Sequence, residues 1–159
     1  MSRIRSRNPR WWKILALACL TLVGGLGHAP SAGAALRQPA LVVGDDRGGQ
    51  ILARMREIGA LRQEGRDVRI VGSVCYSACT MLIGLETACV SPYTVFGFHG
   101  PSRSGQRLAP GAFERASTLI AAHYPPQIRA WYLKTARHEI DGLLRVSGKD
   151  LIALGMRAC

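Results

Sequence analysis

The sequence predicts a single α/β domain with a small parallel sheet, preceded by an N-terminal export segment. Short apolar runs of strand character alternate with segments in which apolar residues recur at helical spacing. Each connection between consecutive strands is a predicted helix, which is the connection that parallel strands need. A length of 159 residues with 48% hydrophobic and 19% charged residues suits one folded domain and excludes a disordered chain.

Residues 1–35 are expected to form a secretory signal. Five basic residues and no acidic residue precede an uncharged run that begins at Ile14, and Ala32-x-Ala34 is a cleavage pattern before Ala35. The alternative is an uncleaved anchor, because residues 14–36 carry no Asp, Glu, Lys or Arg and are long enough to span a bilayer. We therefore expect residues 36–159 to be periplasmic or secreted, or held at the inner membrane facing the periplasm.

The elements of the domain follow from local patterns. Residues 40–44 form an apolar run typical of a strand, and a turn at 45–49 follows it. From Gln50 the apolar residues take helical spacing, with charged residues between them, until Gly65 ends the helix. The remaining expected elements are a strand at 68–71, a tight turn at 72–77, a helix at 78–85, a strand at 90–98 interrupted early by Pro92, a flexible polar loop at 100–111, helices at 113–123 and 127–136 parted by Pro125-Pro126, and a helix at 149–154 ending at Gly155.

The formal net charge of +11 does not indicate a nucleic-acid binder. Five of the 21 lysines and arginines belong to the export segment. The others are scattered and do not alternate with aromatic residues in one stripe, as a nucleic-acid surface would require. We interpret them as a solvated basic surface and expect no nucleic-acid partner.

One group of residues carries a chemical signal. The strand at 68–71 leads through a glycine turn to Ser77, which opens an apolar helix, and His99 ends the next strand. Parallel strands joined by right-handed crossovers end at one edge of a sheet, so the two side chains should meet within about 3–5 Å, as a nucleophile and its base do. The turn at Gly48-Gly49 lies at the same edge and exposes backbone N–H groups suited to an oxyanion.

Each of these pieces also has a simpler interpretation when it is taken alone. A serine at the start of a helix is ordinarily a cap, and a histidine in a turn is ordinarily structural. A pair of glycines is a weak signal. Only their placement at corresponding strand ends favours a site for acyl transfer.

The same segments resemble the proteolytic subunit of Clp protease and the wider Clp/crotonase fold, over residues 41–157. Asp46-Arg-Gly-Gly-Gln-Ile51 is similar to the family's Ser-Pro-Gly-Gly turn, although Arg47 replaces the proline. Gly72-Ser-Val-Cys-Tyr-Ser77-Ala-Cys79 resembles the nucleophile segment. Cys89-Val-Ser-Pro92 through Phe98-His99-Gly-Pro101 resembles the run to the catalytic histidine, and Ser147 to Met156 resembles a C-terminal helix ending in Gly-Leu.

The resemblance implies a truncated Clp-like fold and an exported serine hydrolase acting on a peptide or protein substrate. It implies Ser77 as nucleophile, His99 as base and Asp141 as the third triad member, with the N–H groups of Gly49 and Ala78 binding the oxyanion. No metal or other cofactor is expected, and the oligomeric state is left open. The alternative is a non-catalytic envelope protein that keeps the fold for binding or assembly.

Export would place Cys75, Cys79, Cys89 and Cys159 in an oxidising compartment, where four cysteines allow three pairings. A zinc site would need two closely spaced pairs, and Cys89 and Cys159 each stand alone. We predict Cys75–Cys79, because these residues flank the start of a helix. The resemblance implies Cys89–Cys159, because the C-terminal segment of that fold runs near the strand that contains Cys89.

Overall fold

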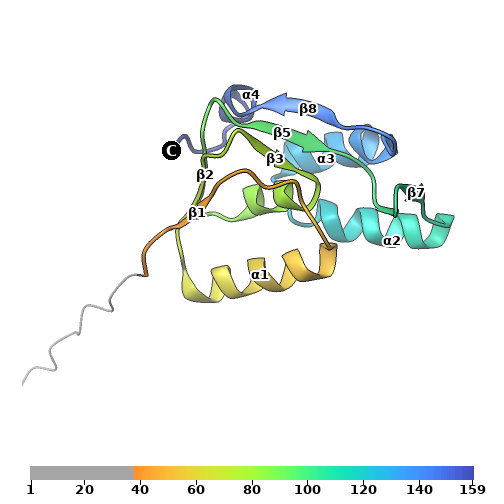
Figure 1. Cartoon of the computed structure of the whole chain (residues 1–159), viewed down its shortest axis with the longest axis horizontal. Coiled ribbons are helices and arrows are strands. Elements are labelled where there is room, and N and C mark those ends of the chain that lie inside the picture. Colours follow the sequence, from red (N-terminus) through yellow and green to blue (C-terminus); the bar gives the residue numbers. More distant parts are fainter. Residues whose placement is uncertain (1–37) are drawn as a thin grey trace, which may run out of the picture. The chain divides into compact units, whose positions relative to one another are not determined.

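A computed structural model describes residues 38–159 (Figure 1). The predicted export segment lies outside the described residues. None of the helices within residues 38–159 combines the length and the hydrophobicity of a membrane-spanning segment. The elements in chain order are β1 (Leu41–Val43), α1 (Ile51–Glu64), β2 (Val68–Ile70), β3 (Val74–Tyr76), the 3₁₀ helix η1 (Ser77–Gly84), β4 (Ala88–Val90), β5 (Val95–Phe98), β6 (Ser102–Arg103), β7 (Gln106–Arg107), α2 (Pro110–Ala121), α3 (Pro126–Lys134), η2 (Ala136–His138), β8 (Leu144–Ser147) and α4 (Gly148–Ala153).

The strands form two small sheets and a hairpin, which corrects the expectation of one parallel sheet. The first sheet has the order β1-β2-β4 and is parallel throughout, and the second has the order β3-β5-β8. β3 and β5 are parallel, whereas β8 runs antiparallel to β5. The class is mixed α/β, and the site described below depends on the second sheet.

The predicted strand at 90–98 is wrong as a single element. Its first residue, Val90, is the end of β4 in the first sheet, and Val95–Phe98 are β5 in the second, with a turn that includes Pro92 between them. The predicted tight turn at 72–77 is likewise a bend followed by β3. A proline supplies no N–H to a sheet ladder, so the chain leaves one sheet there and enters the other.

The polar segment at 100–111 is also more ordered than the sequence indicated. β6 and β7 pair as a two-stranded hairpin, and its central residues Ser104 and Gly105 both have positive φ, as a type I′ turn requires. β8 has no counterpart among the predicted elements. It takes its place in the sheet through the register that pairs Phe96 with Val146 and Phe98 with Leu144.

The helices lie close to where the sequence predicted them. α1 ends at Gly65, whose φ of 57° is the left-handed conformation of a helix C-cap. Ile58 and Leu61 of α1 are buried with Val68 and Ile70 of β2 in the hydrophobic core. The segment after Ser77 is a 3₁₀ helix, and most of its side chains are buried.

Aromatic side chains join the second sheet to the helices of the C-terminal half. Phe98 of β5 makes edge contacts with Tyr124 and Trp131, at ring-centroid distances of 5.6 and 5.1 Å. Tyr124 contacts Tyr132 of α3 in the same way at 5.2 Å. These contacts hold the α2–α3 corner against the strand that leads to His99.

Two disulfides are present, with the connectivity that was predicted. Cys75 is bonded to Cys79 across the β3–η1 junction, with Cα atoms 5.3 Å apart. Cys89 of β4 is bonded to Cys159, with Cα atoms 4.9 Å apart. Backbone hydrogen bonds between Val90 and both Arg157 and Cys159 hold the C-terminal segment beside β4.

Candidate active site

Ser77 occupies a strained turn between a strand and a helix. β3 ends at Tyr76 and η1 begins at Ser77 itself. The φ angle of Ser77 is 55°, a left-handed conformation that few residues other than glycine adopt. A sharp strand-to-helix turn of this kind holds a nucleophile's hydroxyl out from the sheet. The strain at Ser77 was not visible in the sequence.

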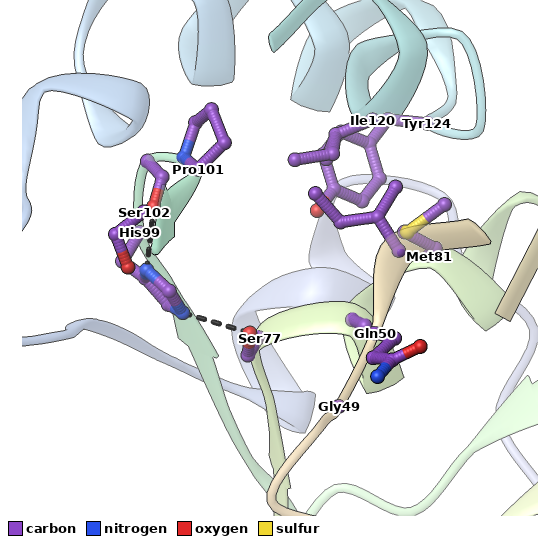
Figure 2. Close-up of a pocket in the computed structure, with 12 residues that line it drawn as sticks. Gly49, Gln50, Ser77, Met81, His99, Pro101, Ser102, Ile120 and Tyr124 are labelled. Carbon is purple, nitrogen blue, oxygen red and sulfur yellow. Dashed lines mark hydrogen bonds between the residues drawn. The ribbon is translucent and has the colours of Figure 1, made fainter. Parts of the chain in front are cut away.

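His99 lies within hydrogen-bonding distance of Ser77, as expected. The distance from His99 Nε2 to Ser77 Oγ is 2.7 Å (Figure 2). β3 and β5 are adjacent parallel strands in which Tyr76 pairs with Gly97, so the chain segments that follow them leave the sheet side by side. The strands that bring the two side chains together are β3 and β5, not the strands at 68–71 and 90–98 from which the contact was predicted.

The second ring nitrogen decides which tautomer His99 adopts. Nδ1 lies 2.7 Å from the carbonyl oxygen of Gly100. A carbonyl oxygen only accepts hydrogen bonds, so Nδ1 carries the proton and donates it. In the neutral imidazole, Nε2 is then the unprotonated nitrogen and accepts the hydrogen bond of the Ser77 hydroxyl. This is the tautomer that a general base requires.

Asp141 does not hold the imidazole. It lies in the loop between η2 and β8 with its side chain exposed, and the Nδ1 proton goes to Gly100 instead. The same loop meets the site at Gly100, whose N–H donates to the carbonyl of Glu139 at 2.7 Å. The Glu139 carboxylate accepts the N–H of Gly142 and so closes its own loop.

The predicted oxyanion donors line the same cavity. Gly49 and Ala78 both belong to its wall, and Ala78 is in the first turn of η1, where backbone N–H groups have no partner inside the helix. Within residues 38–159, neither N–H donates to a backbone or side-chain acceptor outside regular structure. The positive end of the helix favours negative charge at this point.

Gly48 brings the glycine turn into contact with the nucleophile. A methyl group on Gly48 would lie 2.5 Å from Ser77 Cβ and 3.0 Å from the Ala78 nitrogen. Its φ of 98° adds a second reason for glycine at this position. The Gly48 N–H itself donates to Asp46 Oδ1 at 2.7 Å, so Gly49 is left as the donor of this turn.

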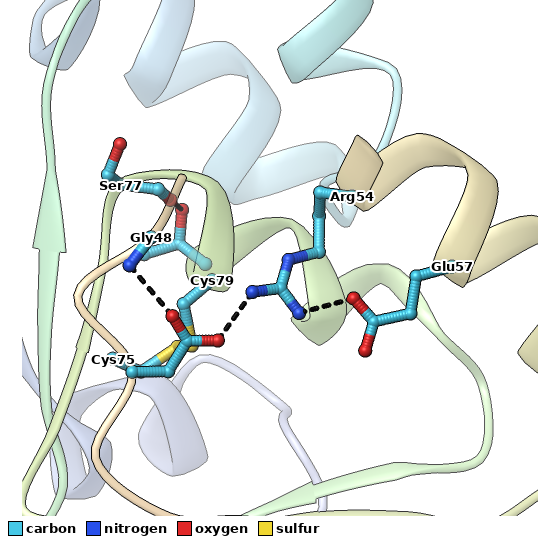
Figure 3. Close-up of polar contacts among 8 residues, drawn as sticks. Gly48, Arg54, Glu57, Cys75, Ser77 and Cys79 are labelled. Atoms are coloured by element: carbon cyan, nitrogen blue, oxygen red, sulfur yellow. Dashed lines mark hydrogen bonds and ion pairs between the residues drawn. A yellow bond between two sulfur atoms is a disulfide. The ribbon is translucent and has the colours of Figure 1, made fainter. Parts of the chain in front are cut away.

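A chain of ion pairs holds this turn in place (Figure 3). Asp46 accepts from the Gly48 N–H with one oxygen and pairs with Arg54 through the other. Arg54 also bonds Glu57 at 2.7 Å, and only 12% of its side chain is exposed. The expectation of a solvated basic surface is therefore wrong for Arg54. Asp46 two residues before Gly48 is an Asx-turn pattern that the sequence does contain.

Thr80 and Tyr124 hold the other side of Ser77. The Thr80 hydroxyl donates to the Ser77 carbonyl oxygen at 2.7 Å, and Tyr124 Oη lies 2.6 Å from Thr80 Oγ1. Because Thr80 has already used its proton, Tyr124 is the donor of the second bond. Burial raises the pKa of Tyr124 above its ordinary value, so the phenol keeps this proton. No sequence pattern pointed to either residue.

His99 is held by its main chain as well. The hydroxyl of Tyr132, a fully buried residue of α3, lies 3.3 Å from the His99 carbonyl oxygen. Burial also raises the pKa of Tyr132, which keeps it a donor. The imidazole is thus positioned by its ring nitrogens and by its own backbone.

The Ser77–His99 pair opens into a cavity of about 260 Å³. Figure 2 shows Met81, Ile120 and Tyr124 on the side away from His99, with Pro101 and Ser102 beyond the imidazole. The polar pair therefore faces an apolar wall. A cavity of this kind accommodates an apolar group attached to a reacting carbonyl.

The other two described histidines lie away from this cavity. His123 is buried at the α2–α3 corner, and burial lowers its pKa, with the nearby Arg62 lowering it further. His138 is exposed at the end of η2. Neither lines the Ser77 cavity. Within residues 38–159, no three His, Cys, Asp or Glu side chains gather as metal ligands would.

Comparison with known proteins adds no assignment. No family model matches the chain, and no curated protein matches it. The proposal below therefore rests on the residues and their geometry.

Proposed function

We propose that this chain is an exported serine hydrolase that uses Ser77 as nucleophile and His99 as general base on a peptide or ester carbonyl. The observation that carries the proposal is the 2.7 Å contact between Ser77 Oγ and His99 Nε2, with the opposite ring nitrogen bonded to the Gly100 carbonyl. A hydroxyl bonded to an oriented imidazole is the arrangement of an activated nucleophile. The positive φ of Ser77 and the free N–H groups beside it support the same conclusion.

In this proposal the Ser77 oxygen attacks the carbonyl carbon while its proton passes to His99 Nε2. The carbonyl oxygen becomes an oxyanion and accepts hydrogen bonds from the Gly49 and Ala78 N–H groups. The imidazolium then gives the proton to the leaving amine or alcohol, and an acyl-Ser77 ester remains. Water, deprotonated by His99, hydrolyses that ester and restores both side chains.

The Gly100 carbonyl takes the place that Asp141 was expected to fill. It holds the tautomer and the ring orientation, which are two functions of the third triad member. Unlike a carboxylate, it carries no full negative charge and stabilises an imidazolium less. We therefore propose a Ser–His dyad, and a slower reaction than a complete triad would give.

The fold relationship and the location belong to the same proposal. We retain the resemblance of residues 41–157 to the Clp/crotonase fold as a hypothesis, with Arg47 in place of the family's proline as a departure. Two disulfides support an oxidising compartment and so the periplasmic or secreted location.

Labelling of the exported chain with a neutral fluorophosphonate probe tests the function. The wild-type chain should be labelled on one peptide containing Ser77, and Ser77→Ala should not be labelled. His99→Ala should lose almost all labelling, whereas His138→Ala, at an exposed histidine outside the cavity, should retain it. Asp141→Asn should also retain it, because Asp141 does not contact the imidazole.

The non-catalytic alternative is favoured by one observation: His99 Nδ1 is bonded to the Gly100 carbonyl and not to the carboxylate that a complete triad uses. It predicts that no probe labels the folded chain, although disulfides and circular dichroism are native. That result would reject the hydrolase and leave a binding role for the cavity.

A further inference from the structure

A row of side chains crosses the outer face of the second sheet beside Ser77. Hydrogen bonds between Asp46 and the residues on either side of Cys75 extend this sheet by one segment, so Arg47 lies beside Tyr76. Tyr76 pairs with Gly97 in β5, and Gly97 pairs with Arg145 in β8. Partners in register share a face, and Cys75, one residue before Tyr76, points into the core. Arg47, Tyr76 and Arg145 therefore lie on the outer face.

Both guanidinium groups gather on the ring of Tyr76. The Arg47 Cζ atom is 5.9 Å from the ring centroid, and that of Arg145 is 6.0 Å from it. Gly97 leaves room for this arrangement, because a methyl group there would lie 2.6 Å from Tyr76 Cδ1. The ring of Tyr76 thus lies over Gly97 of β5, and the two arginines approach it from the segments on either side.

These two arginines have no anionic partner of their own. Within residues 38–159, neither belongs to an ion pair nor donates a side-chain hydrogen bond, and both are exposed. The pair of arginines on Phe113 is different, since Arg137 there bonds Glu114 and Arg107 donates to a backbone carbonyl. Two like charges held near one ring repel each other until an anion binds between them.

We propose that Arg47, Tyr76 and Arg145 bind a carboxylate of the substrate next to the scissile bond. Tyr76 directly precedes Ser77, and Gly97 is two residues before His99, so the row lies within about 7 Å of the site along the strands. When a peptide is bound at Ser77 with one side chain in the apolar cavity, a neighbouring part of the peptide lies over this row. Paired guanidiniums match a carboxylate in geometry and charge. The proposal rests on the proposed hydrolase site for the position of the ligand.

The carboxylate has two possible sources, an Asp or Glu side chain and the C-terminus of a peptide, and the test separates them. Octapeptides bearing an uncharged dye are titrated by fluorescence polarisation onto the Ser77→Ala chain, which cannot turn them over. One series moves a single Glu along an amidated peptide, a matched series carries Gln, and a third carries Gln with a free C-terminus.

At one position, Glu should bind about tenfold more tightly than Gln if the side chain is recognised. If the terminal carboxylate is recognised, the Gln peptide with a free C-terminus should bind about tenfold more tightly than the amidated Gln peptide. Arg47→Gln with Arg145→Gln should reduce the ratio to about one, whereas Arg56→Gln with Arg69→Gln removes equal charge elsewhere and should keep it. Equal binding of all three series, or equal losses in both double variants, would overturn the proposal.

The outcome is separate from that of the hydrolase proposal. A chain that binds the acidic peptide through Arg47 and Arg145 but resists the neutral fluorophosphonate retains the carboxylate site and loses the hydrolase. A chain that is labelled at Ser77 but shows no preference for a carboxylate retains the hydrolase and loses the carboxylate site.

Discussion

The two disulfides close loops of very different length in two different regions. Cys89–Cys159 joins residues 70 apart and holds the C-terminal segment against β4 of the first sheet. Cys75–Cys79 joins residues four apart and encloses Ser77 at the end of β3 in the second sheet. A long closed loop restricts the unfolded chain far more than a short one. The first disulfide therefore serves stability, and the second serves the shape of one turn.

Replacing the long-loop disulfide is the largest perturbation that the comparison suggests. Cys89→Ala with Cys159→Ala should lower the free energy of unfolding by about 4 kcal/mol in the chain-entropy model. Urea unfolding measures this loss. At a temperature where the variant stays folded, fluorophosphonate labelling of Ser77 should match the wild type, because neither cysteine contacts the site. Slower labelling of the folded variant would contradict the separation of the two regions.

Removing the short-loop disulfide should give the opposite pattern. Cys75→Ala with Cys79→Ala should cost about 2 kcal/mol in the same model. Labelling of Ser77 should slow by about tenfold to a hundredfold, because a displacement of about 1 Å is enough for such a loss. Urea unfolding measures the stability of this variant, and fluorophosphonate labelling measures the reactivity of its Ser77. A variant that is less stable but labelled at the normal rate would show that the remaining contacts suffice to shape the turn.

Thr80 offers a sharper test of what shapes this turn. Thr80→Val keeps the side-chain shape but leaves the buried Tyr124 hydroxyl and the Ser77 carbonyl without their partner, at a cost of about 1–3 kcal/mol. Thr94→Val is a matched control, since this buried threonine donates to the carbonyl of Gly72, outside the cavity. Both variants should lose stability in denaturant, and only Thr80→Val should slow labelling. Equal labelling rates would remove Thr80 as a positioning residue.

The smallest expected effect concerns the backbone of Ser77. A left-handed φ in a residue other than glycine costs roughly 1 kcal/mol or more. The free energy of unfolding of Ser77→Gly should therefore exceed that of Ser77→Ala by about 1 kcal/mol at the midpoint. Ser77→Gly should accordingly unfold at a higher temperature. The control is the same pair of substitutions at Ser104, which has a φ of 51° in the hairpin turn. There too the glycine variant should be more stable than the alanine variant. Calorimetry that ranks Ser77→Ala above Ser77→Gly would show that the turn is not strained.

The sequence predicted elements best where the signal is local and long. α1 has fourteen residues and ends at a glycine, and both features can be read without the fold. The strands have only two to four residues each, too few for a period of two to be recognised. This is why β4 and β5 were merged, why the tight turn hid β3, and why β8 went unnoticed.

The meeting of Ser77 with His99 was predictable because it depends on chain order and the handedness of crossovers, which are the same wherever the strands lie in the sheet. The Cys75–Cys79 pairing followed from spacing. The partner of His99 Nδ1 was not predictable. A carboxylate in the sequence is a visible candidate, whereas every residue has a carbonyl, and only the path of the chain after β5 brings that of Gly100 to the ring.

The sequence alone thus determined the mixed α/β class, the helix boundaries marked by glycine and proline, and the pair of residues at the strand ends. The tertiary structure decided how the strands divide between two sheets, which groups hold the turn around Ser77, and where Arg47 and Arg145 converge. Local patterns record the conformation of each segment and its buried side. They carry no record of which distant backbone or side-chain group meets it, because those contacts exist only once the segments have packed together.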